Sequence, residues 1–326
     1  MTTTDVTTAP VRTKATLMGH LRIMRVDHWV KQVFVLPGIA ISLTSDGKPI
    51  PDSIWWTIPV GMLAVSIVSS SNYVINEVLD APSDRSHPIK SKRPVPSGKV
   101  NIPLAYAQWI ALAILGIGLG FVINTQFALS MVALWVMGCV YNIPPVRSKD
   151  KPYLDVLSES INNPLRMLAG WYMTATTVLP PASLLVSYWM VGCYFMALKR
   201  YAEYRDIGDP QRAAAYRNSF GYYTLERLLV SIVFYASAAM LFLGAFTMRY
   251  RIELILAFPL IALVMAIYLG LAFDTESAVV NPEKLYREKW LMFALAACAV
   301  VMLVLMIVDI TALDDIFKPT GLRIRS

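Results

Sequence analysis

Cysteine, histidine and charged residues are all scarce in this chain of 326 residues. Its three cysteines, Cys139, Cys193 and Cys298, fall inside apolar stretches without paired spacing, which excludes a disulfide framework or a zinc site. His87 lies beside Pro88 in a polar loop, where a hydrogen-bonding turn residue is the usual role, so we assign it no chemistry. The sequence also contains no Gly-rich phosphate loop and no zinc-binding helix motif, which excludes the sites that depend on them.

Apolar residues make up 56% of the chain and charged residues only 16%, which excludes an ordinary soluble domain of this size. Nine stretches are candidate membrane spans, of which the first and fourth are short and the fifth contains polar residues. The sequence therefore predicts an all-α, polytopic membrane protein with a nine-helix transmembrane bundle. The candidate spans are residues 30–46, 54–78, 103–123, 126–143, 153–176, 180–199, 227–248, 252–273 and 289–310.

Lysine and arginine are distributed unevenly between the two sides of the membrane. Segments on one side carry 22 of them and segments on the other side carry 6, and cytoplasmic loops are the ones enriched in positive charge. We therefore expect an integral protein of a bacterial plasma membrane, with its N-terminus and active site in the cytoplasm. The net charge of +7 follows from this topology and from anionic lipid, so no nucleic acid partner is expected.

The chain is expected to form one domain with two tails. Residues 1–15 are rich in threonine and lack the apolar segment of a signal peptide, which predicts a disordered cytoplasmic tail. Residues 16–310 would form a single transmembrane catalytic domain, and residues 311–326 a C-terminal tail. Residues 228–326 show no motif, so their apolar spans are expected to wall the bundle.

The stretch 72–99 is the most informative, because an apolar helix runs there into carboxylates and then into a basic loop. Asn76, Asp80 and Asp84 are four residues apart, so a helix places them on one face. Oxygen ligands about 6 Å apart suit Mg²⁺, which usually takes one or two carboxylates together with substrate phosphates. A solvated helix end is the more common explanation of one such aspartate pair, but ionisable residues at the end of a membrane helix favour a function.

The loop after this helix combines positive charge with proline. A phosphate-rich ligand would require such charge, and the prolines stiffen the backbone, so the loop loses less entropy on closing over a polyanion. We expect this loop to act as a lid over the site. Its cations are Arg85, Lys90, Lys92, Arg93 and Lys99.

Span five carries its own polar stripe, because Asp155, Glu159, Asn162, Asn163 and Arg166 fall on one face of a helix. Each charge at the centre of a membrane helix costs roughly 2.5–3.5 kcal/mol, so these side chains are expected to face a polar cavity. The alternative is an internal network of Arg166 with Asp155 and Glu159 that only locks helices together.

A second cytoplasmic cluster follows span six. Lys199 and Glu203 are one helical turn apart, Arg200 and Asp206 lie beside them, and Arg217 lies further along. A juxtamembrane helix without a catalytic role would look similar. The recurrence of carboxylates with dense Lys and Arg after spans two and six indicates two halves of a bundle, with phosphate- and metal-binding groups around a shared cavity.

Two further cations flank these segments. Lys31, before the first span, is either an interface anchor together with Trp29 or a phosphate contact at the mouth of the site. Lys149 ends a proline-broken turn after span four, and we expect its charge to lie further from the metal site. Lys149→Ala should therefore be milder than Asp80→Ala or Asp84→Ala, which should abolish turnover.

These features resemble the UbiA-type intramembrane prenyltransferases, whose fold is a nine-helix bundle with a lateral opening for an isoprenoid chain. Within that superfamily the chain is most similar to the decaprenyl-phosphate phosphoribosyltransferase group, over about residues 22–230. The most specific part is the Asn76, Asp80 and Asp84 motif with the run SDRSHPIKSKRP (83–94). Further landmarks are HWVKQ (28–32), Asp155 followed by Arg166 and Gly170, KRYAE (199–203) and RNSFGYYT (217–224).

The resemblance implies that phosphoribosyl diphosphate is held through Mg²⁺ and that its ribosyl C1 is transferred to a membrane-bound polyprenyl phosphate. Asn76, Asp80 and Asp84 would hold the metal, and Asp80, Asp84 and Glu203 would be the catalytic residues. The substrate-binding candidates are Lys31, Lys90, Arg93, Tyr141, Asp155, Arg166, Lys199, Arg200, Asp206 and Arg217.

The sequence departs from the family pattern at three places. Glu77 follows Asn76 where Asp is usual, and Gln32 stands where Asn is usual. The second motif is not the Asp-x-x-x-Asp of aromatic prenyltransferases, which counts against a prenyl diphosphate held between two aspartate clusters. Asp206 nevertheless lies near enough to leave that donor open.

Three functions are compatible with the sequence. The first is transfer of 5-phosphoribosyl to a polyprenyl phosphate, whose ionised phosphate needs no general base. The second is transfer of a prenyl group from a prenyl diphosphate to an aromatic or other small acceptor. The third is a non-enzymatic carrier of lipid phosphates, which is disfavoured because the polar residues cluster at one membrane face instead of the midplane.

Overall fold

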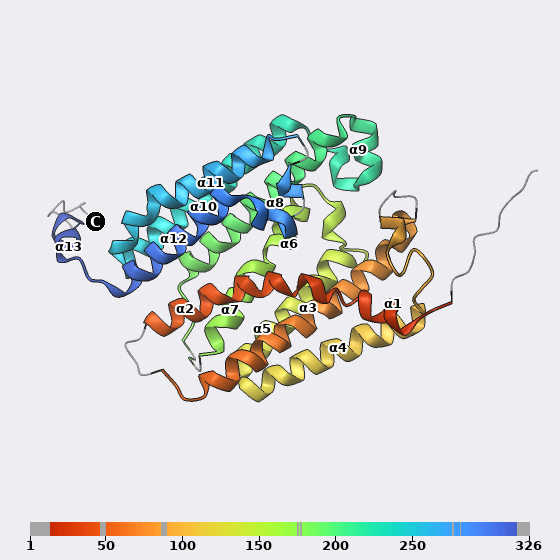
Figure 1. The fold of residues 1–326 in the computed structure, drawn as a ribbon, viewed down its shortest axis with the longest axis horizontal. Helices are drawn as coiled ribbons and strands as arrows, with labels where there is room; N and C mark the ends of the chain where they lie inside the picture. Colours follow the sequence, from red (N-terminus) through yellow and green to blue (C-terminus); the bar gives the residue numbers. More distant parts are fainter. Residues whose placement is uncertain are drawn as a thin grey trace, which may run out of the picture.

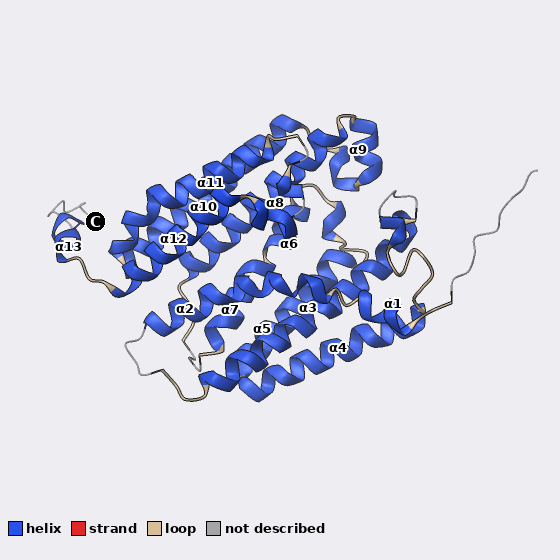
Figure 2. Cartoon of the chain, viewed as in Figure 1, coloured by secondary structure: helices blue, strands red, loops and turns tan. Residues whose placement is uncertain are grey.

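The computed structural model describes residues 14–45, 50–85, 90–174, 176, 178–275, 277–280 and 282–317. Helices account for the secondary structure of this part of the chain, and no strand occurs in it (Figure 2). Most of the predicted N-terminal tail, His87 and Pro88 lie outside the described residues. The all-α prediction is confirmed.

The helices follow the apolar stretches of the sequence. Short 3₁₀ segments, labelled η, connect several of them. The elements are α1 (Leu17–Arg22), η1 (Val26–Val35), α2 (Leu36–Ser45), α3 (Ile54–Asp84), η2 (Lys90–Lys92), α4 (Ile102–Ile123), α5 (Thr125–Asn142), η3 (Ser148–Asp150), α6 (Leu154–Ser160), α7 (Asn162–Tyr172), α8 (Ala182–Ile207), α9 (Pro210–Tyr216), η4 (Asn218–Gly221), α10 (Leu225–Tyr250), η5 (Ile252–Ala257), α11 (Phe258–Ala272), η6 (Ala278–Val280), η7 (Pro282–Arg287), α12 (Lys289–Ile307) and α13 (Thr311–Phe317).

Seven helical stretches of the described chain are long and apolar enough to cross a membrane, which supports a polytopic membrane protein. The predicted count of nine continuous spans is not exact. Span 30–46 is divided between η1 and α2, and span 153–176 is divided between α6 and α7. In both cases a proline, Pro37 or Pro164, occupies the first turn of the second helix, where its missing N–H does no harm.

The helix α3 is longer than the sequence predicted and carries the aspartate motif at its end. It has 31 residues and continues through Pro82 to Asp84, which corresponds to a length of about 46 Å. A hydrocarbon layer is about 30 Å thick, so α3 is longer than one perpendicular crossing requires. Asp80 and Asp84 lie in its last two turns.

The bundle consists of two groups of helices (Figure 1). In the first group α2, α3, α5 and α7 share an apolar core that includes Val65, Phe127 and Trp171, and α4 packs along α3. In the second group α8, α10, α11 and α12 share a core that includes Tyr194 and Leu228. Each group supplies one of the polar segments described below.

Two glycines allow the broken first span to pack closely against α7. A Cβ atom on Gly170 would lie 2.1 Å from the carbonyl oxygen of Val35, and one on Gly38 would lie 1.9 Å from that of Met167. No other residue fits either position without moving the backbone. This close packing sets the distance between the mouth of the bundle and the polar residues of α6 and α7.

Candidate active site

Asp80 is the centre of the first polar cluster. Its Oδ1 accepts hydrogen bonds from Lys149 Nζ at 2.5 Å and from an Arg147 amino group at 3.0 Å. One turn earlier, Asn76 donates through Nδ2 to Asn142 Oδ1, which also accepts from Lys149 Nζ at 2.9 Å. The turn after α5 therefore brings two cations onto the aspartate motif.

Asp84 and Glu77 fasten the basic loop to α3. Asp84 Oδ2 forms an ion pair with Arg93 at 2.7 Å, and Glu77 Oε1 accepts the backbone N–H of Val95 at 3.1 Å. Arg25 lies 3.7 Å from the other oxygen of Glu77. These contacts hold the described part of the predicted lid against the end of α3.

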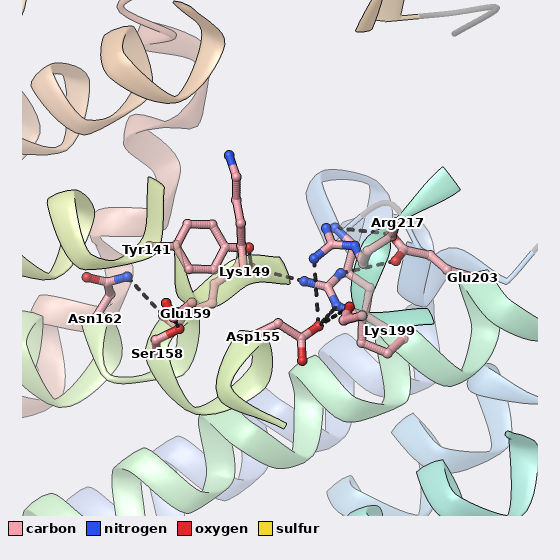
Figure 3. Close-up of polar contacts among 12 residues, drawn as sticks. Tyr141, Lys149, Asp155, Ser158, Glu159, Asn162, Lys199, Glu203 and Arg217 are labelled. Atoms are coloured by element: carbon pink, nitrogen blue, oxygen red, sulfur yellow. Dashed lines mark hydrogen bonds and ion pairs between the residues drawn. The ribbon is translucent and has the colours of Figure 1, made fainter. Parts of the chain in front are cut away.

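The second polar cluster includes Asp155, Glu159 and Glu203, which Figure 3 labels. The buried guanidinium of Arg200 on α8 pairs with all three. Its Nε pairs with Asp155 at 3.1 Å, one amino group pairs with Glu159 at 3.1 Å, and the other pairs with Glu203 at 3.0 Å. The side chain of Arg200 is only 2% exposed and that of Asp155 is fully buried. Buried charges need such complete pairing, because each loses its hydration.

Asp155 joins this cluster to the segment that follows α9. Its Oδ1 accepts from Tyr223 OH at 2.6 Å, and its Oδ2 accepts from Ser219 Oγ at 3.1 Å. Arg217 lies 3.7 Å from the same carboxylate. Burial and the neighbouring Asp155 raise the pKa of the Tyr223 hydroxyl, which therefore stays a hydrogen-bond donor. These bonds fix the orientation of the carboxylate.

Tyr141 and Lys149 connect the two clusters. Tyr141 OH donates to Glu159 Oε2 at 2.7 Å, and the ammonium of Lys149 lies 5.9 Å from the centre of the Tyr141 ring. A continuous chain of contacts thus leads from Asp80 through Lys149, Tyr141 and Glu159 towards Arg200. Figure 3 shows Lys149, Tyr141 and Glu159 from this series of contacts.

Lys90 in the loop also lies between the two groups of helices. Its ammonium is 4.6 Å from the centre of the Tyr216 ring on α9. Burial lowers the pKa of Lys90, and the nearby carboxylates of Asp84 and Glu203 act in the opposite sense. The effect of a carboxylate on the pKa of a neighbouring ammonium falls off over a short distance. The acidic ends of α3 and α8 therefore both flank Lys90. The two clusters therefore face one region, as a shared site requires.

Other candidate residues lie at the edge of these clusters or away from them. Arg166 donates through Nε to Gln32 Oε1 at 3.2 Å, so the alternative network of Arg166 with Asp155 and Glu159 is not formed. Lys31 lies 6.0 Å from the centre of the Tyr73 ring, and Lys199 lies 4.0 Å from Glu203. Asp206 pairs with its neighbour Arg205 at 2.7 Å, away from the cluster around Arg200.

The position expected for Lys149 was wrong. The sequence suggested that its charge lies further from the aspartates, but its ammonium contacts Asp80 directly. The cause is the turn after α5, which folds residues 147–149 back onto α3. Arg147 has a φ of 30° there, a backbone conformation that non-glycine residues rarely adopt. Spacing along the sequence gives no sign of this approach.

Several polar residues of the site were not selected from the sequence. Asn142, Arg147, Ser219 and Tyr223 each contact a candidate residue. Asn142 and Arg147 lie in the stretch 141–149 that closes span four, and Ser219 and Tyr223 lie in the run RNSFGYYT (217–224). Proximity to Tyr141 or Arg217 was therefore the available signal. The basic residues Lys92 and Lys99 line a different cavity, on the other side of the loop.

The donor atoms of the aspartate motif fit a divalent cation that takes few protein ligands. Asn76 donates through its nitrogen, and Asp80 and Asp84 accept their partners through one oxygen each. One oxygen of each side chain thus has no hydrogen-bond or ion-pair partner within the part of the chain that the structure describes. In the described residues no three His, Cys, Asp or Glu side chains converge, which fits Mg²⁺ bound mainly through substrate phosphates.

Relatives with known names match part of this sequence. A decaprenyl-phosphate phosphoribosyltransferase from Corynebacterium glutamicum is 32% identical over 196 residues, which are 57% of this chain and 54% of that protein. The match thus spans about half of that relative. One with the same name from Mycobacterium tuberculosis is 27% identical over 227 residues, 69% of this chain and 72% of that protein.

The fold is also known from solved structures. A UbiA homologue from Archaeoglobus fulgidus, bound to DMAPP and Mg²⁺, superposes with a TM-score of 0.66 at 20% identity and covers 86% of this chain and 99% of that one. The model of the UbiA prenyltransferase family matches residues 33–295. The chain therefore belongs to the UbiA prenyltransferase family, as its motifs predicted.

Proposed function

We propose that the protein is a Mg²⁺-dependent transferase that moves a 5-phosphoribosyl group from phosphoribosyl diphosphate to a polyprenyl phosphate. The names of the corynebacterial and mycobacterial relatives support this donor and acceptor. The composition of the site supports them independently, because cations from both groups of helices surround two acidic segments. Such a site suits a donor with phosphate at both ends.

The observation that carries the proposal is the pairing of Arg200 with three carboxylates. A prenyl diphosphate held between two metal sites needs free carboxylates on both segments, but here Asp155 and Glu203 are both ion-paired to Arg200. In the α3 motif, Oδ2 of Asp80 and Oδ1 of Asp84 have no partner among the described residues. The second cluster, with Arg217 and Lys199 at its edge, is better suited to bind the 5-phosphate of a sugar.

The residues of this chain have distinct parts in the reaction. Mg²⁺, held by Asn76, Asp80 and Asp84, would neutralise charge on the diphosphate. Lys149 and Lys90 neutralise the remaining charge as the ribosyl C1–O bond breaks, because a sugar C1 passes through an oxocarbenium-like state. Arg200 orients Asp155 and Glu203 without needing to contact the reacting atoms.

The acceptor needs no base from the protein. A polyprenyl phosphate is ionised at neutral pH, so its oxygen attacks C1 directly. This explains why the site contains tyrosines and cations where a base would otherwise be expected. The apolar walls of α10, α11 and α12 provide the surface for the isoprenoid chain.

Purified protein with Mg²⁺ tests the proposal against prenyl transfer. Labelled phosphoribosyl diphosphate should transfer its label to decaprenyl phosphate, whereas labelled dimethylallyl diphosphate should not label aromatic acceptors. The reverse result would establish the prenyltransferase. Incorporation from neither donor, together with counterflow of a lipid phosphate, would establish a carrier.

Two variants test the site within the same assay. Asp80→Asn and Lys149→Ala should each lower kcat/KM by about 100-fold or more, since each removes charge that stabilises the departing diphosphate. Lys151→Ala is the matched control, because Lys151 is exposed two residues further on. Its kcat/KM should stay within about twofold of the wild type. Equal losses in Lys149→Ala and Lys151→Ala would contradict the assignment.

A further inference from the structure

A second basic site lies on the opposite side of the loop that carries Arg93. A cavity of about 390 Å³ opens between α1 and residues 92–99, and Arg22, Lys92 and Lys99 line it together with Thr16 and Gly19. Arg93 points to Asp84, while its neighbour Lys92 lines this cavity. The cavity therefore shares no lining side chain with the candidate active site.

The three cations of this cavity are not neutralised by the protein. Among the described residues, none of them has an ion-pair or side-chain hydrogen-bond partner, and no acidic residue lines the cavity. Elsewhere on the same loop, Arg93 and Lys90 are each engaged by side chains. Three unpaired cations around one cavity repel each other, and a phosphate group would remove that repulsion.

Backbone contacts join α1 to the loop beside the cavity. Thr16 Oγ1 accepts the N–H of Gly19 at 3.0 Å, and the N–H of Thr16 donates to the carbonyl of Lys99 at 3.0 Å. A Cβ on Gly19 would lie 2.2 Å from that carbonyl oxygen, so α1 and the loop touch through their backbones. These contacts place the backbones of Arg22 and Lys99 on the same cavity.

The helix α1 also lies beside the start of a membrane-spanning helix. His20 is buried, its Nδ1 is 3.0 Å from Gln108 Oε1 on α4, and its Nε2 accepts the N–H of Asn101 at 3.2 Å. These bonds hold α1 against the first two turns of α4. Its outward side chains, Leu17, Met18 and Leu21, are 79%, 55% and 49% exposed. Exposed apolar side chains beside the start of a membrane-spanning helix suit the boundary of a lipid layer.

We propose that this cavity binds the phosphate of an acidic phospholipid, with Arg22, Lys92 and Lys99 on the headgroup and Leu17 and Leu21 against the acyl chains. The chemistry that the cations recognise is a phosphate anion, which a soluble phosphate also offers. The exposed leucines favour the lipid, because a soluble ion would have no use for them. The site anchors the loop whose other face holds Asp84.

Lipid titration of the full-length protein in a neutral detergent tests this proposal. Phosphatidylglycerol should raise the melting temperature at lower concentrations than phosphatidylcholine does. In the triple variant Arg22→Gln, Lys92→Gln and Lys99→Gln, the apparent affinity for phosphatidylglycerol should fall by at least about tenfold. These side chains are exposed, so the variant is expected to fold.

A matched triple variant controls for loss of charge. This variant removes three exposed cations from elsewhere on the chain, through Lys151→Gln, Arg212→Gln and Lys289→Gln. Its affinity for phosphatidylglycerol should stay within about twofold of that of the wild type. An equal loss of affinity in both triple variants, or no loss in either, would overturn the proposal.

Two further measurements separate a lipid from a soluble phosphate. Leu17→Asn with Leu21→Asn should weaken phosphatidylglycerol binding by about threefold or more, because the acyl chains lose apolar contacts. Inorganic phosphate at millimolar concentration should not reproduce the stabilisation. If inorganic phosphate does reproduce it, and the basic triple variant abolishes that effect, the ligand is a soluble phosphate and the lipid assignment is wrong.

Discussion

Arg200 is a buried cation of the site, and its guanidinium holds Asp155, Glu159 and Glu203 together. Its partners come from α6 and from α8 itself, so the ion pairs fix one helix against another. A buried ion pair contributes little net stability when complete, but removing one member leaves the others without hydration or a partner. The position of the second cluster therefore depends on this one side chain.

Arg200→Met should strongly destabilise the protein. We expect the free energy of unfolding to fall by about 3–5 kcal/mol, because three carboxylates lose their common partner. Thermal unfolding of the detergent-solubilised protein measures this change. Arg212→Met, an exposed arginine of α9, is the control and should change it by no more than about 0.5 kcal/mol. A similar small change in Arg200→Met would show that the cluster contributes little to stability.

Lys90 gives the site a pH dependence. Burial holds the pKa of its ammonium below 10.5, whereas the unfolded chain keeps this proton up to about pH 10.5. Between the lowered pKa and 10.5 the unfolded state therefore binds more protons, and the free energy of unfolding rises with pH. The stability that burial costs at neutral pH is recovered as Lys90 loses its charge.

Comparison with Lys90→Gln isolates this effect. The melting temperature of the wild type, minus that of the variant, should increase from about pH 8 to about pH 10. Burial raises the pKa of the Tyr216 hydroxyl, but Tyr216 is present in both proteins, so its own titration largely cancels in this difference. A difference that stays constant or decreases with pH would mean that Lys90 is not buried as a cation.

The spacing of Asp80 and Asp84 could be derived from the sequence, because both lie in one helix and helical geometry fixes their relation. The residues that pair with these carboxylates could not be derived from the sequence. Lys149 is 69 residues from Asp80, and Arg200 is 45 residues from Asp155. Which cation meets which carboxylate depends on how α5, α6 and α8 pack, and hydrophobic periodicity carries no information on that. Local geometry was therefore predictable and long-range pairing was not.

Among the helices, the two broken spans are the features that hydropathy missed. The stretch 153–176 is apolar enough on average to suggest one helix, but the chain turns at Ile161 between α6 and α7. Asn162 donates to the carbonyl of Glu159 at 2.9 Å and closes this turn. Side-chain bonds to the backbone of this kind compete with helix continuation, and a window average over apolar residues cannot detect them.

Because α7 packs closely against Val35, an added methyl group should destabilise the protein at Gly170 but not at a glycine with open space around it. Gly170→Ala should lower the free energy of unfolding by about 1–3 kcal/mol, because the new Cβ meets the backbone carbonyl of Val35. Gly118→Ala on α4 is the matched control, since a Cβ there has no neighbour within 4 Å. It should be neutral or stabilising by up to about 1 kcal/mol. Thermal unfolding compares the two, and equal effects would contradict the packing.

The bundle as a whole has a polar end, formed by η2, α9 and the ends of α3 and α8, and an opposite end near α13 (Figure 1). The distribution of Lys and Arg predicts that the polar end faces the cytoplasm. Substrates that are made in the cytoplasm would then reach the site directly. This orientation follows from charge alone and is open to a direct measurement.

Single cysteines and an impermeant maleimide measure the orientation. Asp52→Cys, in the exposed segment before α3, should be labelled in intact cells. Lys151→Cys, exposed near the polar end, should be labelled only after the membrane is permeabilised. The unmodified chain controls for the native cysteines, two of which are buried. Labelling in the opposite pattern would invert the orientation and place the site outside the cell.

The length of α3 has a consequence for the proposed acceptor. A helix of 31 residues is longer than one perpendicular crossing of the hydrocarbon layer, and its carboxylates lie in its last turns. If that end projects from the bilayer, a polyprenyl phosphate with its tail in the bilayer would bring its phosphate to a fixed depth beside them. Short, freely soluble analogues would lack that alignment and lose the benefit of proximity.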